Sequence, residues 1–157
     1  MKKWAILLLF LAFLCSSFLF FVPSPAHAWD IPCTNGTNYA DGRNTYDGIA
    51  IWGESCIIFA PTGGQWGLGK FTGRSDSRTS KWVDGLFATI QGVQRCGSGS
   101  WGQTFWGQDG PRSANFTSAH GEGSVFECGP GGSHSYGFVS GHYFGEAKGF
   151  AFTKLPL

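Results

Sequence analysis

Four side chains in the last third of the sequence have the chemistry for acid–base or metal catalysis. They are His120, Glu122, His134 and His142. Three imidazoles and a carboxylate are a donor set that can hold a metal ion, and a histidine beside a glutamate can serve as acid and base. The spacing places His120 and Glu122 on one face of an extended strand but does not bring the other two near. We therefore keep a small metal-dependent or His/Glu-dependent hydrolase as an alternative prediction.

A second group of side chains has the chemistry for ligand binding. The glycine- and serine-rich segment at residues 96–110 holds two tryptophans with amide and carboxylate neighbours, and a tyrosine stands among glycines further on. Flat rings with a few orienting polar groups are typical of sites that bind sugars. The predicted binding residues are Trp101, Gln103, Trp106, Asp109 and Tyr143. They favour a non-catalytic binding module for glycan or cell-surface material over an enzyme.

The cysteines indicate how the chain is held together. Besides Cys15, the sequence has four: Cys33, Cys56, Cys96 and Cys128. An even set in an exported protein predicts two disulfides, and three pairings are open. Cys33 with Cys56 and Cys96 with Cys128 is the favoured pairing because each bond closes a local loop. The spacing lacks the short C-x₂₋₄-C element of a zinc site, so we expect no metal and no cofactor.

The first 28 residues have the pattern of a secretory signal peptide. Lys2 and Lys3 precede a long apolar run, which a proline break and the Ala26-His27-Ala28 motif follow. We expect cleavage before Trp29, although the run approaches the length of a membrane anchor helix. The mature protein, residues 29–157, would then be a single secreted domain with no membrane span.

Charge and composition exclude some partners and leave one broad alternative. Removal of the two lysines changes the formal net charge from +1 to −1, which gives no electrostatic footprint for nucleic acid or anionic membrane. The 25 glycines suggest low complexity, but the many tryptophans and phenylalanines indicate a folded core. Small size, disulfides and export would also suit a secreted toxin, bacteriocin or inhibitor.

The elements that position these residues are predicted to be strands. Alternating apolar residues and turn-forming clusters predict strands at residues 48–60, 66–71, 82–93, 100–106, 114–120, 124–128, 135–144 and 149–155. Residues 33–47 and 72–81 are predicted to be polar loops, with a turn at 108–111. The pattern indicates an all-β fold, an antiparallel sandwich or barrel of short strands stapled by two disulfides.

The strand at residues 135–144 has two different faces. The two-residue period places Phe138, Ser140 and His142 on a core-like face, with Gly141 and Tyr143 opposite. The glycines either allow another layer to approach closely or leave a shallow groove beside Tyr143. We favour a central, closely packed strand.

Overall fold

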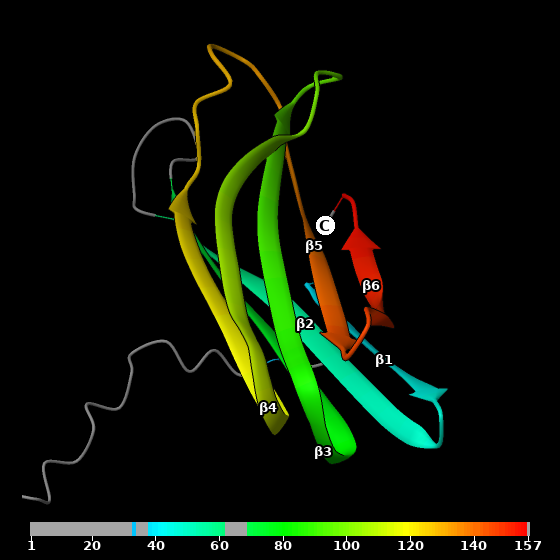
Figure 1. Cartoon of the computed structure of the whole chain (residues 1–157). Coiled ribbons are helices and arrows are strands. Elements are labelled where there is room, and N and C mark those ends of the chain that lie inside the picture. Colours follow the sequence, from blue (N-terminus) through cyan, green and yellow to red (C-terminus); the bar gives the residue numbers. More distant parts are fainter. Residues whose placement is uncertain (1–32, 34–37, 62–68, 157) are drawn as a thin grey trace, which may run out of the picture. The chain divides into compact units, whose positions relative to one another are not determined.

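The described part of the chain is an antiparallel β-sheet. The computed structural model describes Cys33 and residues 38–61 and 69–156, which belong to one compact unit, Ile31–Leu157. The predicted signal peptide and its cleavage site lie outside these residues. The strands (Figure 1) are β1 (Tyr39–Tyr46), β2 (Ile49–Pro61), β3 (Gly69–Cys96), β4 (Gly102–Ser124), β5 (His134–Phe144) and β6 (Lys148–Lys154). The all-β prediction is confirmed.

Strand β3 changes its partner halfway along its length. One edge of β3 pairs with β4 from Lys70 to Gln94, so that the two strands form one long hairpin. The other edge pairs first with β2, over residues 69–79, and then with β5, over residues 87–96. The sheet therefore folds into two layers. The first layer contains β1, β2, the first half of β3 and the second half of β4. The second contains the remaining halves with β5 and β6.

The sheet bends from one layer into the other where the β3–β4 ladder is irregular. The register shifts between Arg78 and Val83, and twice more before Ala88. Extra residues in one strand bend a ladder and increase its twist. Gly85 has a φ of 66° and Gly110 a φ of 94°, conformations that glycine adopts without steric cost. The long green and yellow-green strands of Figure 1 curve accordingly, and the result is a nearly closed, barrel-like sheet.

Glycines on the inner faces allow the two layers to approach each other. The ring of Phe105, on β4, lies among Gly73, Gly92 and Gly121, and a Cβ atom on any of the three would be 2.5 Å or less from a ring carbon. Gly53 on β2 faces the ring of His142 on β5 in the same way. The high glycine content is thus a packing requirement, since larger side chains at these positions would separate the layers.

Side chains join the sheet at both of its open margins. On one side, the Asp109 carboxylate accepts hydrogen bonds from the Thr117 hydroxyl at 2.6 Å and the Ser118 amide at 3.2 Å, which links the two halves of β4. On the other side, β1 and β6 are the ends of the strand order. There the Tyr46 hydroxyl donates to the Gly149 carbonyl at 2.6 Å and the Lys154 ammonium to the Tyr39 carbonyl at 2.5 Å.

The interior has two apolar clusters with a polar band between them. One cluster contains Ile57, Phe71, Ala88, Ile90, Phe105, Ala119, Val125 and Phe138. The other contains Ile51, Val83, Leu86, Ala114 and Phe144. Along β2, β3 and β5 the inward positions between the clusters are small or polar, and all are buried: Gly53, Ser55, Ser75, Ser77, Ser140 and His142. The prediction of a central, closely packed strand at residues 135–144 is confirmed.

Several local predictions are wrong. Residues 39–46, expected in a loop, form β1, and residues 72–81 lie inside β3. The turn expected at 108–111 lies inside β4. The strand expected at 124–128 is not formed, because Ser124 ends β4 and residues 125–128 are irregular. Strands β3 and β4, with 28 and 23 residues, are not short. The cause is shared: the layers require glycine and serine at inward positions, and the outward positions are charged, so these strands have the composition of loops.

Both disulfides follow the favoured pairing. Cys33 is bonded to Cys56 on β2, and Cys96, at the end of β3, is bonded to Cys128. The first bond holds Cys33 at Cys56, whose side chain lies on the outer side of the first layer. The second holds the connection between β4 and β5 beside the end of β3. Each closes a local loop and restricts the unfolded chain.

The glycine contacts around Phe105 predict a specific loss of stability. Gly92→Ala should lower the free energy of unfolding by about 1 to 3 kcal/mol, because the new methyl group collides with a buried ring. Gly102→Ala is the control, since its Cβ would lie 3.4 Å from the Phe126 ring, an ordinary contact. Urea unfolding measures both, and the control should change by less than about 0.5 kcal/mol. Equal effects of the two substitutions would contradict this packing.

Candidate functional site

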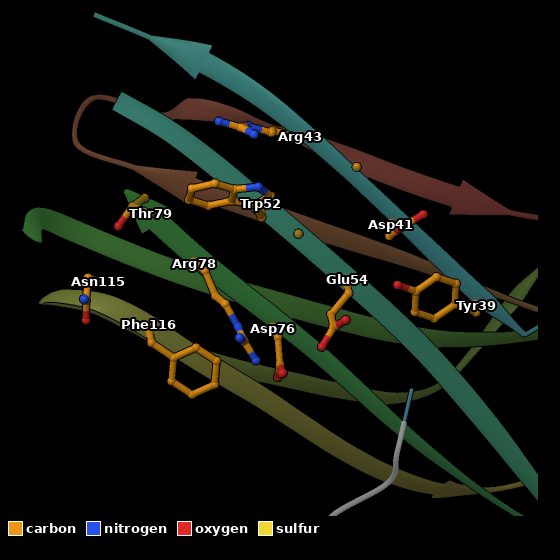
Figure 2. Close-up of a pocket in the computed structure, with 12 residues that line it drawn as sticks. Tyr39, Asp41, Arg43, Trp52, Glu54, Asp76, Arg78, Thr79, Asn115 and Phe116 are labelled. Atoms are coloured by element: carbon orange, nitrogen blue, oxygen red, sulfur yellow. The ribbon is translucent and has the colours of Figure 1, made fainter. Parts of the chain in front are cut away.

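A groove crosses the outer face of the first layer. It has a volume of about 930 Å³ and extends over β1, β2, the first half of β3 and the second half of β4 (Figure 2). Its walls combine three aromatic rings with charged and amide side chains. They are Tyr39, Asp41, Gly42, Arg43, Trp52, Gly53, Glu54, Asp76, Arg78, Thr79, Asn115 and Phe116. We call this feature the outer groove.

Strand register places the groove residues in rows. Residues directly opposite each other in an antiparallel ladder lie on the same face, with neighbouring Cβ atoms. Arg43 is opposite Trp52, Trp52 is opposite Arg78, and Arg78 is opposite Phe116. These four residues form the arginine–aromatic row, which crosses four strands. A second row lies two residues away from the first along each strand. In it, Asp41 is opposite Glu54 and Glu54 is opposite Asp76. We call these three residues the acidic row.

Cations and rings are stacked within the arginine–aromatic row. The guanidinium carbon of Arg43 is 4.5 Å from the centre of the Trp52 ring. That of Arg78 is 5.1 Å from the centre of the Phe116 ring. Each contact is a cation–π interaction, which fixes the plane of the guanidinium. Phe116, on the edge strand β4, is nevertheless 42% exposed, which is a large exposed fraction for an apolar side chain of this size.

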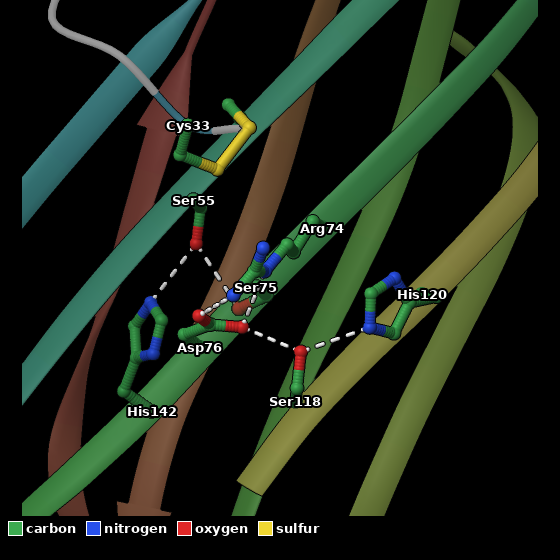
Figure 3. The surroundings of a disulfide bond; sticks show 9 residues. Cys33, Ser55, Arg74, Ser75, Asp76, Ser118, His120 and His142 are labelled. Atoms are coloured by element: carbon green, nitrogen blue, oxygen red, sulfur yellow. Dashed lines mark hydrogen bonds and ion pairs between the residues drawn. A yellow bond between two sulfur atoms is a disulfide. The ribbon is translucent and has the colours of Figure 1, made fainter. Parts of the chain in front are cut away.

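The acidic row has one rigid member. Asp76 is 1% exposed. Its carboxylate accepts bonds from Arg74 at 2.9 and 2.5 Å and from the Ser118 hydroxyl at 2.5 Å (Figure 3). Burial opposes ionisation of Asp76, but these bonds and the charges of Arg74 and Arg78 outweigh it and hold the pKa of its carboxyl below the usual value. Asp76 is therefore a fixed anion at the floor of the groove.

Tyr39 closes the acidic end of the groove. Burial, followed by the charges of Asp41 and Glu54 and hydrogen bonds to them, raises the pKa of Tyr39 to about 12. The phenol thus remains protonated beside the carboxylates of Asp41 and Glu54. Asp41 is exposed and Glu54 is half-buried, so both keep oxygen atoms that can accept hydrogen bonds from a ligand.

The predicted binding residues lie apart from the outer groove. Trp106 is 51% exposed on the first half of β4. Gln103, on the same half, accepts a hydrogen bond from Gln91 at 3.0 Å. Trp101, in the turn before β4, is covered by the Arg95 guanidinium at 4.9 Å.

The other two predicted binding residues have internal contacts. Besides Thr117 and Ser118, Asp109 forms an ion pair with Arg112. The Tyr143 ring stacks on Phe87 with a centroid separation of 5.1 Å. That ring also covers the bare backbone at Gly141, where a shallow groove was the alternative expectation.

The predicted acid–base residues are distributed over three places. His120 and Glu122 lie on the second half of β4, where the Ser118 hydroxyl bonds His120 Nε2 at 2.9 Å and Glu122 pairs with Lys70. His134 Nδ1 is 2.9 Å from the side-chain nitrogen of Gln94, near the Cys96–Cys128 bond. Among the described residues, no three His, Cys, Asp or Glu side chains are grouped so that they could hold a metal ion.

His142 lies in the polar band of the interior. It is fully buried, and its ring nitrogens bond the Ser55 hydroxyl at 3.1 Å and the Ser77 hydroxyl at 2.9 Å. The bond to Ser55 appears in Figure 3. Burial lowers the pKa of His142 to about 4, although Asp76 acts in the opposite direction through its backbone hydrogen bond and its charge. The imidazole is therefore neutral at neutral pH and links β2, β3 and β5.

Sequence reasoning did not find the outer groove. Its signal is an alternation of large polar or aromatic residues with small ones, as in Trp52-Gly53-Glu54 and Asp76-Ser77-Arg78. Two of its four strands contain segments that were predicted as loops, and the rows appear only once the register is known.

Comparison with known proteins identifies no family. No model of a known protein family matches the chain, and no curated protein is significantly similar to it. None of the described residues belongs to a helix long and apolar enough to cross a membrane. Function is therefore inferred from the geometry of the site.

The lowered pKa of His142 predicts that the free energy of unfolding depends on pH. The unfolded chain takes up a proton below the ordinary histidine pKa of 6.5, whereas folded His142 does so only near 4. Between these values the unfolded state binds more protons, so acidification lowers stability by about 3 kcal/mol through this residue. The free energy of unfolding measured from pH 7 to pH 4 should decrease accordingly, and His142→Gln should remove this part of the decrease. An NMR titration of the His142 ring with a midpoint near 6.5 would contradict the prediction.

Proposed function

We propose that the protein is an exported, non-catalytic module that binds glycan in the outer groove. The observation that carries the proposal is the composition of the groove, in which rings lie beside the exposed carboxylate of Asp41 and the half-buried carboxylate of Glu54 within about 930 Å³. Ligand sites combine apolar surfaces with a few fixed polar groups that orient the ligand, and sugars present hydroxyl groups between weakly apolar ring faces. The two disulfides agree with an oxidising compartment outside the cytosol.

Binding is favoured over hydrolysis by the state of the carboxylates. A glycosidase needs one carboxyl that acts as an acid and a second that acts as a base or nucleophile. In the acidic row, both oxygens of Asp76 are engaged by Arg74, and Ser118 adds a third bond. A buried carboxylate held in this way is poorly placed to attack a substrate. Asp41 and Glu54 lie beside the Tyr39 phenol, and we assign them the role of accepting hydrogen bonds from the ligand.

Substitutions can distinguish binding in the outer groove from binding at the tryptophans that the sequence analysis selected. Trp52→Ala and Phe116→Ala should weaken glycan binding roughly tenfold or more, because a ring in a binding site contributes apolar contact that alanine lacks. Trp106→Ala is the matched control, since Trp106 is exposed but lies outside the groove. A glycan array would find the ligand and calorimetric titration would measure the affinities. Loss of binding in Trp106→Ala alone would move the site to the first half of β4.

A further inference from the structure

Two arginines of the outer groove are held in position without a carboxylate partner. Arg43 and Arg78 are exposed, and each guanidinium lies over a ring of the arginine–aromatic row. Within the described part of the chain neither makes an ion pair or a side-chain hydrogen bond. Their contacts in the row are with the rings of Trp52 and Phe116, so their N–H groups keep the capacity to donate to a ligand.

A stacked guanidinium with an open edge is a receptor for an oxyanion. The planar group presents parallel N–H donors that match the two oxygens of a carboxylate, and these charge-assisted bonds are stronger than neutral ones. Arg78 also lies near the fixed anion Asp76, whose pKa it helps to lower. Asp76 is buried and satisfied by Arg74 and Ser118, so a ligand carboxylate would be the exposed partner of Arg78.

The acidic row provides acceptors for the hydroxyl groups of the ligand. Asp41 and Glu54 stand two residues along their strands from the arginine–aromatic row, which is about 7 Å. Their oxygens accept hydrogen bonds from hydroxyl groups and would repel a ligand that is anionic throughout. A neutral glycan would leave the two guanidinium groups without an anion. The groove therefore suits a ligand with a carboxylate at one edge of each unit and hydroxyls at the other.

We infer that the glycan is acidic, a chain of hexuronate residues whose carboxylates bind Arg43 and Arg78 and whose hydroxyls bind Asp41 and Glu54. This inference rests on the proposed function. The two arginines are separated by strand β2, so their backbone positions are about 10 Å apart. That separation is of the order of two linked pyranose rings, so one chain of hexuronates is long enough to reach both arginines.

The direct test compares acidic oligosaccharides with their own neutral forms. Hexamers of galacturonate, mannuronate and guluronate would be titrated calorimetrically into the full protein, each beside its carboxyl-reduced counterpart. At least one acid should bind roughly tenfold tighter than its reduced form, since two charge-assisted contacts are lost on reduction. Its affinity should also decrease with added salt. Equal binding of the acid and reduced forms overturns the inference but leaves the proposed function intact, whereas no glycan binding at all overturns both.

Variants of the arginines test the assignment residue by residue. Arg43→Gln and Arg78→Gln should each remove most of the preference for the acid, measured as the ratio of the affinities of the acid and the reduced hexamer for the same variant. Arg78→Lys should restore little, because lysine keeps the charge but loses the planar donor pair. Lys81→Gln is the control, since Lys81 is an exposed cation outside the groove. An unchanged preference in both glutamine variants overturns the assignment.

A polyanion without hydroxyl groups tests the acidic row. Poly-L-glutamate presents carboxylates on a peptide chain, so it should bind at least tenfold more weakly than the preferred hexuronate of similar charge. Binding of equal strength, with the same dependence on Arg43 and Arg78, would overturn the inference in favour of an acidic peptide ligand.

Discussion

The pairing of β3 with β4 along almost their whole length is the constraint on which the rest of the structure depends. Because one edge of β3 is occupied by β4 from Lys70 to Gln94, its other edge is free to hold β2 and then β5. A single hairpin thereby contributes to both layers, and its irregular middle, near Gly85 and Gly110, allows the layers to face each other. The register that creates the two rows of the outer groove follows from the same ladder.

The folded hairpin also explains the composition of the chain. Facing halves of one sheet approach closely, so inward positions are occupied by glycine around Phe105 and by serine around His142. Large polar side chains are then restricted to the outward face, where Arg78 and Asp76 lie. The cost is a buried imidazole that must remain neutral, which ties the stability of the fold to pH. Packing inside and recognition outside are thus two consequences of one pattern.

The fold class was predictable from the sequence, whereas the long strands and the groove were not. Alternation along residues 135–144 placed Phe138, Ser140 and His142 on the buried face because β5 has a conventional two-residue period. Local loop closure likewise predicted both disulfides. Residues 72–81 look like a loop because their buried side is Gly73, Ser75 and Ser77, whose inward packing depends on contacts with distant strands. The row from Arg43 to Phe116 joins residues far apart in sequence, and no local pattern contains the register.

NMR distances across β3 test the central claim most directly. The account predicts contacts between the backbone protons of Ser77 and Gly53, and of Gly92 and Phe138, within one monomeric molecule of the oxidised protein. The first pair reports the pairing of β3 with β2 and the second its pairing with β5. If either contact were absent, or were found only between two different chains in a mixed-label sample, β3 would not join two layers of one sheet. Absence of the first contact would also remove the register that forms the rows of the outer groove.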